Sequence, residues 1–98
     1  MTPKTLFKNF VPTDSLQIYA NSLVGQITQK APYDSITFSC IEKINDSYLC
    51  RIEIVSALGR FIGIGSAGKS HIALERAKQK VNWQISKWLK KRVFHNLF

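Results

Sequence analysis

The chain has 98 residues, and 14 Lys and Arg against six Asp and Glu give it a formal net charge of +8. Apolar residues make up 45% and charged residues 20%, which excludes a disordered chain and predicts one domain over residues 1–98. No apolar run approaches the roughly 20 residues of a membrane-spanning helix, and no secretory signal opens the chain, so we expect a cytoplasmic protein that is not bound to a membrane. The surplus of positive charge indicates a polyanionic partner, with nucleic acid ahead of an anionic membrane surface.

The first part of the chain predicts a strand followed by a helix. Residues 4–11 predict a short edge strand, and a turn then leads to a helix N-cap at Thr13 or Asp14. Residues 15–30 predict a helix that ends before Pro32, because apolar side chains recur there at helical spacing. This expected core face consists of Leu16, Tyr19, Ala20, Leu23, Val24 and Ile27.

A hairpin is predicted next, because residues 35–44 and 48–56 both alternate between apolar and polar side chains around the turn residues 45–47. A single apolar face on both strands requires three facing pairs: Ile36 with Ile54, Phe38 with Ile52, and Cys40 with Cys50. All six side chains are then expected to face the core. Without an export signal, the cysteines are expected as reduced, packed thiols rather than as a disulfide.

A third strand is predicted over residues 60–65, followed by a loop over 66–68 and a helix from Lys69 or Ser70 to about Arg92. The element order is therefore β-α-β-β-β-α. Strands joined by short hairpins, with helices at both ends, predict an α+β sandwich: a four-stranded, mostly antiparallel sheet with two helices packed on one face.

The last helix carries most of the net charge, since eight basic residues and one acidic residue, Glu75, lie between positions 69 and 92. Its apolar stripe is expected to face the core and consists of Leu74, Ala77, Val81, Ile85, Trp88 and Leu89. The other side carries most of the basic residues, whereas Lys78 and Arg92 lie near the apolar face or its border. A charged face often does no more than solvate a helix, but with one acidic residue present, ion pairing does not explain this one.

We therefore predict an RNA-contact surface on this helix, formed by Lys69, Arg76, Lys80, Trp83, Lys87, Lys90, Lys91 and Arg92. The basic side chains would neutralise phosphates, and Trp83 would stack on an unpaired base or a ribose. The alternative for Trp83, equally open from the sequence, is packing against the first helix or the end of the chain.

Residues 63–70, GIGSAGKS, match the phosphate-binding loop G-x-x-x-x-G-K-[ST] between a predicted strand and a predicted helix. A nucleotidase of that type needs parallel strands with crossover helices and a later Asp for Mg²⁺, and only one helix follows this segment. A nucleotide-binding protein is therefore a distant alternative. The glycines instead predict a tight turn into a helix capped by Ser66 or Ser70, or N–H groups that hold an RNA phosphate together with Lys69.

The remaining reactive side chains do not form a catalytic pattern. His71 and His95 lie far apart in the sequence, and the two Cys and two His lack the spacing of zinc ligands. The serines have no evident base. We expect no enzyme, no cofactor, no bound metal and no small-molecule substrate.

Both ends of the chain resemble the ribosome hibernation-promoting factors, the family of the ribosome-associated inhibitor and the sigma-54 modulation protein. Residues 11–16, VPTDSL, resemble that family's V-x-x-T-D-A-L entry into a helix. Residues 73–75, ALE, and 80–87, KVNWQISK, resemble its last helix. The resemblance implies a β-α-β-β-β-α fold that binds 16S rRNA of the 30S ribosomal subunit near the decoding site and silences idle ribosomes under stress. Lys80 and Lys87 match basic positions of the family's last helix.

This sequence departs from that family in its first helix, which is nearly uncharged apart from Lys30, and in its glycine-rich segment, which replaces a more acidic connection. The resemblance to short members without a dimerising domain implies a monomer. Double-stranded RNA-binding domains are the alternative, because they share the order α-β-β-β-α and their pattern is weakly matched by Gly65, Lys69 and Ala73. Their run of lysines is missing, since residues 71–72 are His and Ile.

Overall fold

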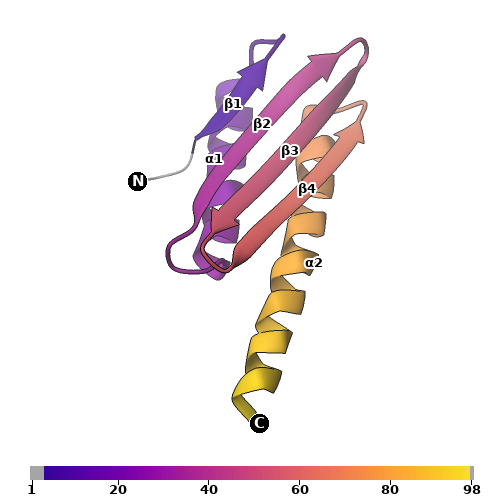
Figure 1. Cartoon of the computed structure of the whole chain (residues 1–98). Coiled ribbons are helices and arrows are strands. Elements are labelled where there is room, and N and C mark those ends of the chain that lie inside the picture. Colours follow the sequence, from indigo (N-terminus) through magenta and orange to yellow (C-terminus); the bar gives the residue numbers. More distant parts are fainter. Residues whose placement is uncertain (1–3, 98) are drawn as a thin grey trace.

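The computed structural model describes the backbone of residues 4–97 and the side chains of residues 4–90. Its elements are β1 (Thr5–Lys8), α1 (Asp14–Lys30), β2 (Ile36–Ile44), β3 (Ser47–Ser56), β4 (Gly59–Ala67) and α2 (Ser70–Leu97), which confirms the predicted order. The strands form one sheet in the order β1-β2-β3-β4, with β1 parallel to β2 and the other neighbours antiparallel. Both helices cover one face of this sheet and leave the other open (Figure 1). No helix in this described part of the chain is both long and apolar enough to cross a membrane.

Helix α1 begins where its polar residues predict. Thr13 is the N-cap, and its hydroxyl oxygen accepts a hydrogen bond from the Leu16 N–H at 3.1 Å, which satisfies one of the free donors at the helix start. The buried face is narrower than the predicted one and consists of Ala20, Leu23, Val24 and Ile27. Leu16 is half-buried and Tyr19 is exposed, because both lie at the border of this face.

The core fills the space between the sheet and the two helices. From α2 it takes Leu74, Ala77, Val81 and Ile85, as the apolar stripe predicts, and also Ala73. Trp88 is half-buried and packs edge-to-face on Phe61, with ring centroids 6.1 Å apart. Leu89 is 41% exposed, which corrects its assignment to the stripe. The reason is that α2 runs past the end of the sheet, so its later turns have no strand beneath them (Figure 1).

The β2–β3 hairpin differs from the prediction by one residue. Ile41 lies opposite Cys50, while Cys40 lies opposite Arg51 and Phe38 opposite Glu53. Because side chains alternate between the faces of a strand, this shift turns the predicted core residues of β2 to the open face. Phe38 is accordingly 57% exposed.

A two-residue turn, Asn45 and Asp46, sets this register by placing Ile44 opposite Ser47. Asn45 adopts a φ of +56°, a conformation that Asn tolerates better than most residues. The predicted register would have required one more residue in the turn.

The two cysteines lie on different faces of the sheet, so the expectation of two packed core thiols holds for Cys50 alone. Both thiols are free; Cys50 is buried in the core and Cys40 is half-buried on the open face. Burial, and to a smaller extent the neighbouring Cys40 thiol, raises the pKa of Cys50 from 9.0 to about 12.

The GIGSAGKS segment is mostly strand and not a loop. Strand β4 continues to Ala67, and Gly68 and Lys69 alone connect it to α2. A β-carbon on Gly65 would lie 2.5 Å from the Ala73 carbonyl oxygen, and one on Gly63 would collide with Ala77 and Val81. The two glycines therefore allow α2 to pack directly on the strand, which replaces the predicted role in a tight turn.

Candidate nucleic-acid interface

Helix α2 has one side toward α1 and one toward the outer edge of β4. Glu75 lies on the α1 side, where its carboxylate accepts a hydrogen bond from the Tyr19 hydroxyl at 2.8 Å. This hydrogen bond, with burial and the negative charge of Glu75, raises the pKa of Tyr19. The acidic residue of the helix is thus turned away from the basic stripe and does not neutralise it.

The other side of α2 is attached to the edge of the sheet through side chains. Gln84 Oε1 accepts from the Ile62 N–H at 2.8 Å, and Gln84 Nε2 donates to the Ile62 carbonyl oxygen at 2.5 Å. One turn earlier, Lys80 Nζ donates to the Ile64 carbonyl oxygen at 2.5 Å. These bonds occupy main-chain groups that an edge strand would otherwise leave open to another chain.

Arg76 continues this ladder one further turn back, since its Nη1 donates to the Ser66 carbonyl oxygen at 2.6 Å. Four helix residues advance about 6 Å, and two strand residues advance about 6.6 Å. Steps of four along α2 therefore match steps of two along β4. The spacing of Arg76, Lys80 and Gln84 is what allows three successive turns to reach the same strand edge.

An aromatic ring stands on the exposed side of this ladder. Trp83 is 62% exposed, and Lys87 Nζ lies 4.6 Å from the centre of its ring. This exposure contradicts the predicted alternative that Trp83 packs against α1, and the other form of that alternative, packing against the end of the chain, lies outside the residues whose side chains the structure describes. Lys87 also borders a shallow hollow of about 270 Å³ together with Arg60, which the sequence did not single out because it is distant along the chain.

The structure brings five of the predicted contact residues together along one side of α2, and a sixth, Lys69, directly precedes the helix. The members with described side chains are all exposed: Lys69, Arg76, Lys80, Trp83, Lys87 and Lys90. We call these six residues the α2 basic stripe. Lys91 and Arg92 belong to α2 but lie outside the residues whose side chains the structure describes. Lys78 is half-buried, as its border position predicts.

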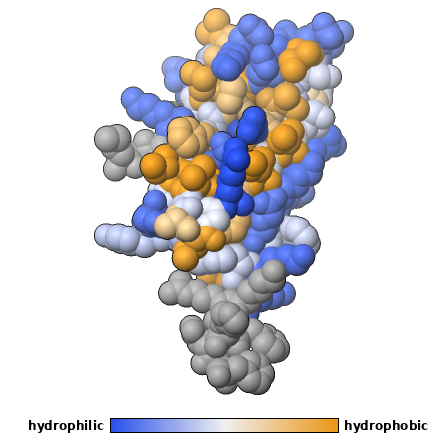
Figure 2. Space-filling view, in the orientation of Figure 1, coloured by the Kyte–Doolittle hydropathy of each residue, from blue (hydrophilic) through white to orange (hydrophobic). Residues whose placement is uncertain are grey.

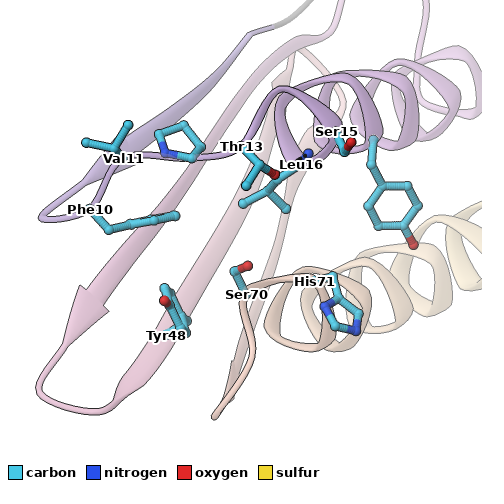
Figure 3. Close-up of a pocket in the computed structure, with 10 residues that line it drawn as sticks. Phe10, Val11, Thr13, Ser15, Leu16, Tyr48, Ser70 and His71 are labelled. Atoms are coloured by element: carbon cyan, nitrogen blue, oxygen red, sulfur yellow. Dashed lines mark hydrogen bonds between the residues drawn. The ribbon is translucent and has the colours of Figure 1, made fainter.

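A larger hollow, of about 410 Å³, lies at the end of the molecule where both helices begin (Figure 3). Phe10 and Tyr48 form one wall, with ring centroids 5.1 Å apart, and Ser70 and His71 reach it from the first turn of α2. None of its described lining residues carries a carboxylate, and no metal-binding cluster of three His, Cys, Asp or Glu occurs among the described residues. The hollow offers aromatic rings, hydroxyl groups and the His71 imidazole.

The fold and this surface define a class: an α+β domain with a mixed four-stranded sheet, two helices on one face and a basic stripe along the second helix. Among solved structures, it is similar to the N-terminal domain of Protein Y from Thermus thermophilus, with a TM-score of 0.75 and 13% identity over 90% of this chain and 99% of that one. It is also similar to a ribosomal subunit interface protein from Coxiella burnetii, with a TM-score of 0.75 and 9% identity over 92% of this chain and 99% of that one.

No family model and no curated protein sequence matches the chain. At identities this low, the likeness is one of fold. It confirms at that level the resemblance to the ribosome hibernation-promoting factors that the two ends of the sequence indicate.

Proposed function

We propose that this protein is a ribosome-associated factor that binds 16S rRNA of the small subunit through the α2 basic stripe and silences translation. The observation that carries the proposal is the placement of the stripe. Apart from Lys69, which directly precedes α2, its basic side chains share one exposed side of the helix, while Glu75, the acidic residue of α2, hydrogen bonds to α1. Such a surface suits a ribose–phosphate backbone, whose charges release counterions when Lys and Arg neutralise them.

Two members of the stripe also hold the β4 edge, and this is compatible with RNA binding. A guanidinium has five N–H donors and an ammonium has three, so Arg76 and Lys80 each keep donors beyond the bond to the strand. Their attachment to β4 fixes the position of both charges before RNA arrives. Less side-chain freedom is then lost on binding.

Trp83 adds a contact that phosphate binding alone does not need. An exposed indole beside lysines is suited to stack on an unpaired base, which favours a folded RNA with accessible bases over a regular duplex. The fold shared with a ribosomal subunit interface protein supports the choice of ribosomal RNA.

Co-sedimentation of the purified chain with 30S subunits, 50S subunits and a plain RNA duplex, at low and moderate salt, tests the proposal. We expect retention on 30S alone, with affinity falling steeply as salt rises. A cell-free translation assay with added protein then tests silencing. Equal retention on the duplex would instead favour a shape-reading double-stranded RNA-binding domain, and binding that ignores salt would contradict the electrostatic account.

A matched pair of variants separates the stripe from charge in general. Lys87→Glu with Lys90→Glu reverses two charges on the stripe, whereas Lys8→Glu with Lys43→Glu reverses two exposed charges on β1 and β2. We expect the first pair to abolish retention on 30S and the second to leave most of it. Similar losses in both would mean that net charge, and not this surface, drives the association.

A further inference from the structure

The open face of the sheet exposes apolar side chains from every strand. Its exposed apolar side chains come from all four strands and are Leu6, Ile36, Phe38, Ile44, Val55 and Ile64, between 38% and 61% exposed. Figure 2 views this face and shows hydrophobic areas over the strands, with hydrophilic side chains between them. Exposed apolar surface of this extent marks interaction sites.

The face is large enough for a specific partner. Strands β2, β3 and β4 have nine or ten residues each and β1 has four, so at about 4.8 Å between strands and about 3.3 Å per residue the face measures roughly 500 Å². Covering it would bury on the order of 500 Å² on each partner, or about 1,000 Å² in total, which is about what a specific interface needs.

A hollow of about 260 Å³ indents this face over Cys40. Leu6 on β1 and Phe38 on β2 border it, and its charged lining residues are Lys4, Arg51 and Glu53, two positive charges against one negative. Cys40 is smaller than these neighbours, so it leaves space at the centre of β2. The hollow is suited to receive one aliphatic side chain with a carboxylate beside it.

The charges on the face favour a negatively charged partner. Its basic side chains are Lys4, Lys8, Arg51 and Arg60, and its acidic ones are Glu42 and Glu53, a net charge of +2. Glu53 is 15% exposed and pairs with both arginines, which are more than half exposed at 53% and 59%. The Glu53 carboxylate is thus already paired with arginines of the same face, and both guanidinium groups keep further N–H donors for a partner.

We propose that the open sheet face is a second docking surface, and that its occupant is a protein segment with aliphatic side chains flanked by Asp or Glu. Aliphatic residues dominate the exposed patch and Phe38 is its one exposed aromatic ring, whereas platforms for unpaired RNA stack bases on several rings. A second copy of this chain would bring another net charge of +8 against the face. The surface lies on the opposite side of the sheet from the helices (Figure 1), so both partners are able to bind at once.

The test titrates the isotopically labelled full chain with a short peptide of alternating Leu and Glu and, separately, with one of alternating Leu and Lys, and follows amide chemical shifts. We expect the Leu/Glu peptide to move the signals of Leu6, Phe38 and Arg51, and the Leu/Lys peptide to have little effect. Leu6→Ser and Arg51→Glu should each weaken Leu/Glu binding about tenfold, because one removes apolar contact and the other repels the carboxylates. Both positions are exposed, and circular dichroism checks that the fold is kept.

Four outcomes overturn the proposal. They are equal binding of the two peptides, no binding of either, a concentration-dependent dimer that Leu6→Ser dissociates, and shifts at Phe38 on adding oligouridine RNA. Lys87→Glu with Lys90→Glu is the matched control, because it disables the proposed RNA surface and should leave Leu/Glu binding unchanged. Failure of one proposal is thereby distinguished from failure of the other.

Discussion

Gly65 in β4 lies so close to Ala73 in α2 that a β-carbon on the glycine would come within 2.5 Å of the Ala73 carbonyl oxygen. The two backbones meet without a side chain between them. Helix α2 therefore packs close to β4, and this close packing allows its side chains to reach the main chain at the outer edge of the strand.

Gly65→Ala should destabilise the fold, because the added methyl group pushes α2 away from the strand. We expect the free energy of unfolding to fall by about 3 kcal/mol, measured by urea denaturation. Gly25→Ala is the matched control, since a β-carbon on Gly25 in α1 would meet nothing within 4 Å. That variant should gain up to about 1 kcal/mol from its higher helix propensity. Equal loss in both variants would contradict the close-packing role of Gly65.

Gln84→Ala should lower the free energy of unfolding by about 2 kcal/mol, because it removes two hydrogen bonds to Ile62 at a half-buried site. It should also promote self-association in size-exclusion chromatography, since the edge of β4 is then open. The exposed Gln79 on the same helix provides the control, and Gln79→Ala should change stability by less than about 0.5 kcal/mol. A monomeric Gln84→Ala variant of unchanged stability would show that the edge needs no such cover.

Trp83 should report RNA binding directly. In a Trp88→Phe variant the indole of Trp83 is the single tryptophan fluorophore, and we expect its emission to be quenched when single-stranded RNA stacks on it. Trp83→Ala should weaken binding about tenfold or more, because stacking of a base contributes about 1–3 kcal/mol. Trp88 is half-buried and its ring packs on Phe61, so Trp88→Phe should bind RNA as tightly as the original chain. Unquenched emission at saturating RNA would place Trp83 outside the contact.

The two thiols should differ in reactivity. At pH 8, N-ethylmaleimide should add to Cys40 and leave Cys50 unmodified, because burial raises the pKa of Cys50 to about 12 and shields its sulfur. Mass spectrometry should find one adduct on the folded chain and two in urea. Two adducts on the folded chain at equal rates would contradict the burial of Cys50.

The same shift predicts a loss of stability in alkali. The pKa of Cys50 is raised on folding. The contribution of this thiol to the free energy of unfolding is therefore complete below pH 9.0 and is lost as the pH rises toward about 12. We expect the free energy of unfolding to fall over this window, and to fall less steeply in Cys50→Ala. Parallel pH profiles for the two proteins would assign the decline to other groups.

The order of the elements, the N-cap at Thr13 and most of the core face of α2 could be predicted from the sequence. These features depend on local signals, namely a capping hydroxyl and apolar residues at helical spacing, and both act within a few residues of the chain. The basic residues could be placed on one side of α2 for the same reason.

Which face of β2 is buried depends on tertiary contacts. Both faces of this strand carry apolar residues, so alternation favoured Phe38 over Ile41 for the core. The structure instead buries or half-buries Ser39 and Thr37, because their hydroxyl groups find partners: Thr5 at 2.9 Å for Ser39 and Thr28 at 2.8 Å for Thr37. Those partners lie on β1 and α1, distant along the chain.

The attachment of α2 to β4 is likewise a tertiary result. Nothing in the sequence around Lys80 indicates that it donates to the Ile64 carbonyl oxygen as well as presenting charge to a ligand. That arrangement exists only because the glycines of β4 let the helix approach until the rise of its turns matches the repeat of the strand. A local pattern predicts the secondary structure of each segment. Residues distant along the chain determine which polar groups of that segment have hydrogen-bond partners and which side chains remain exposed to bind a ligand.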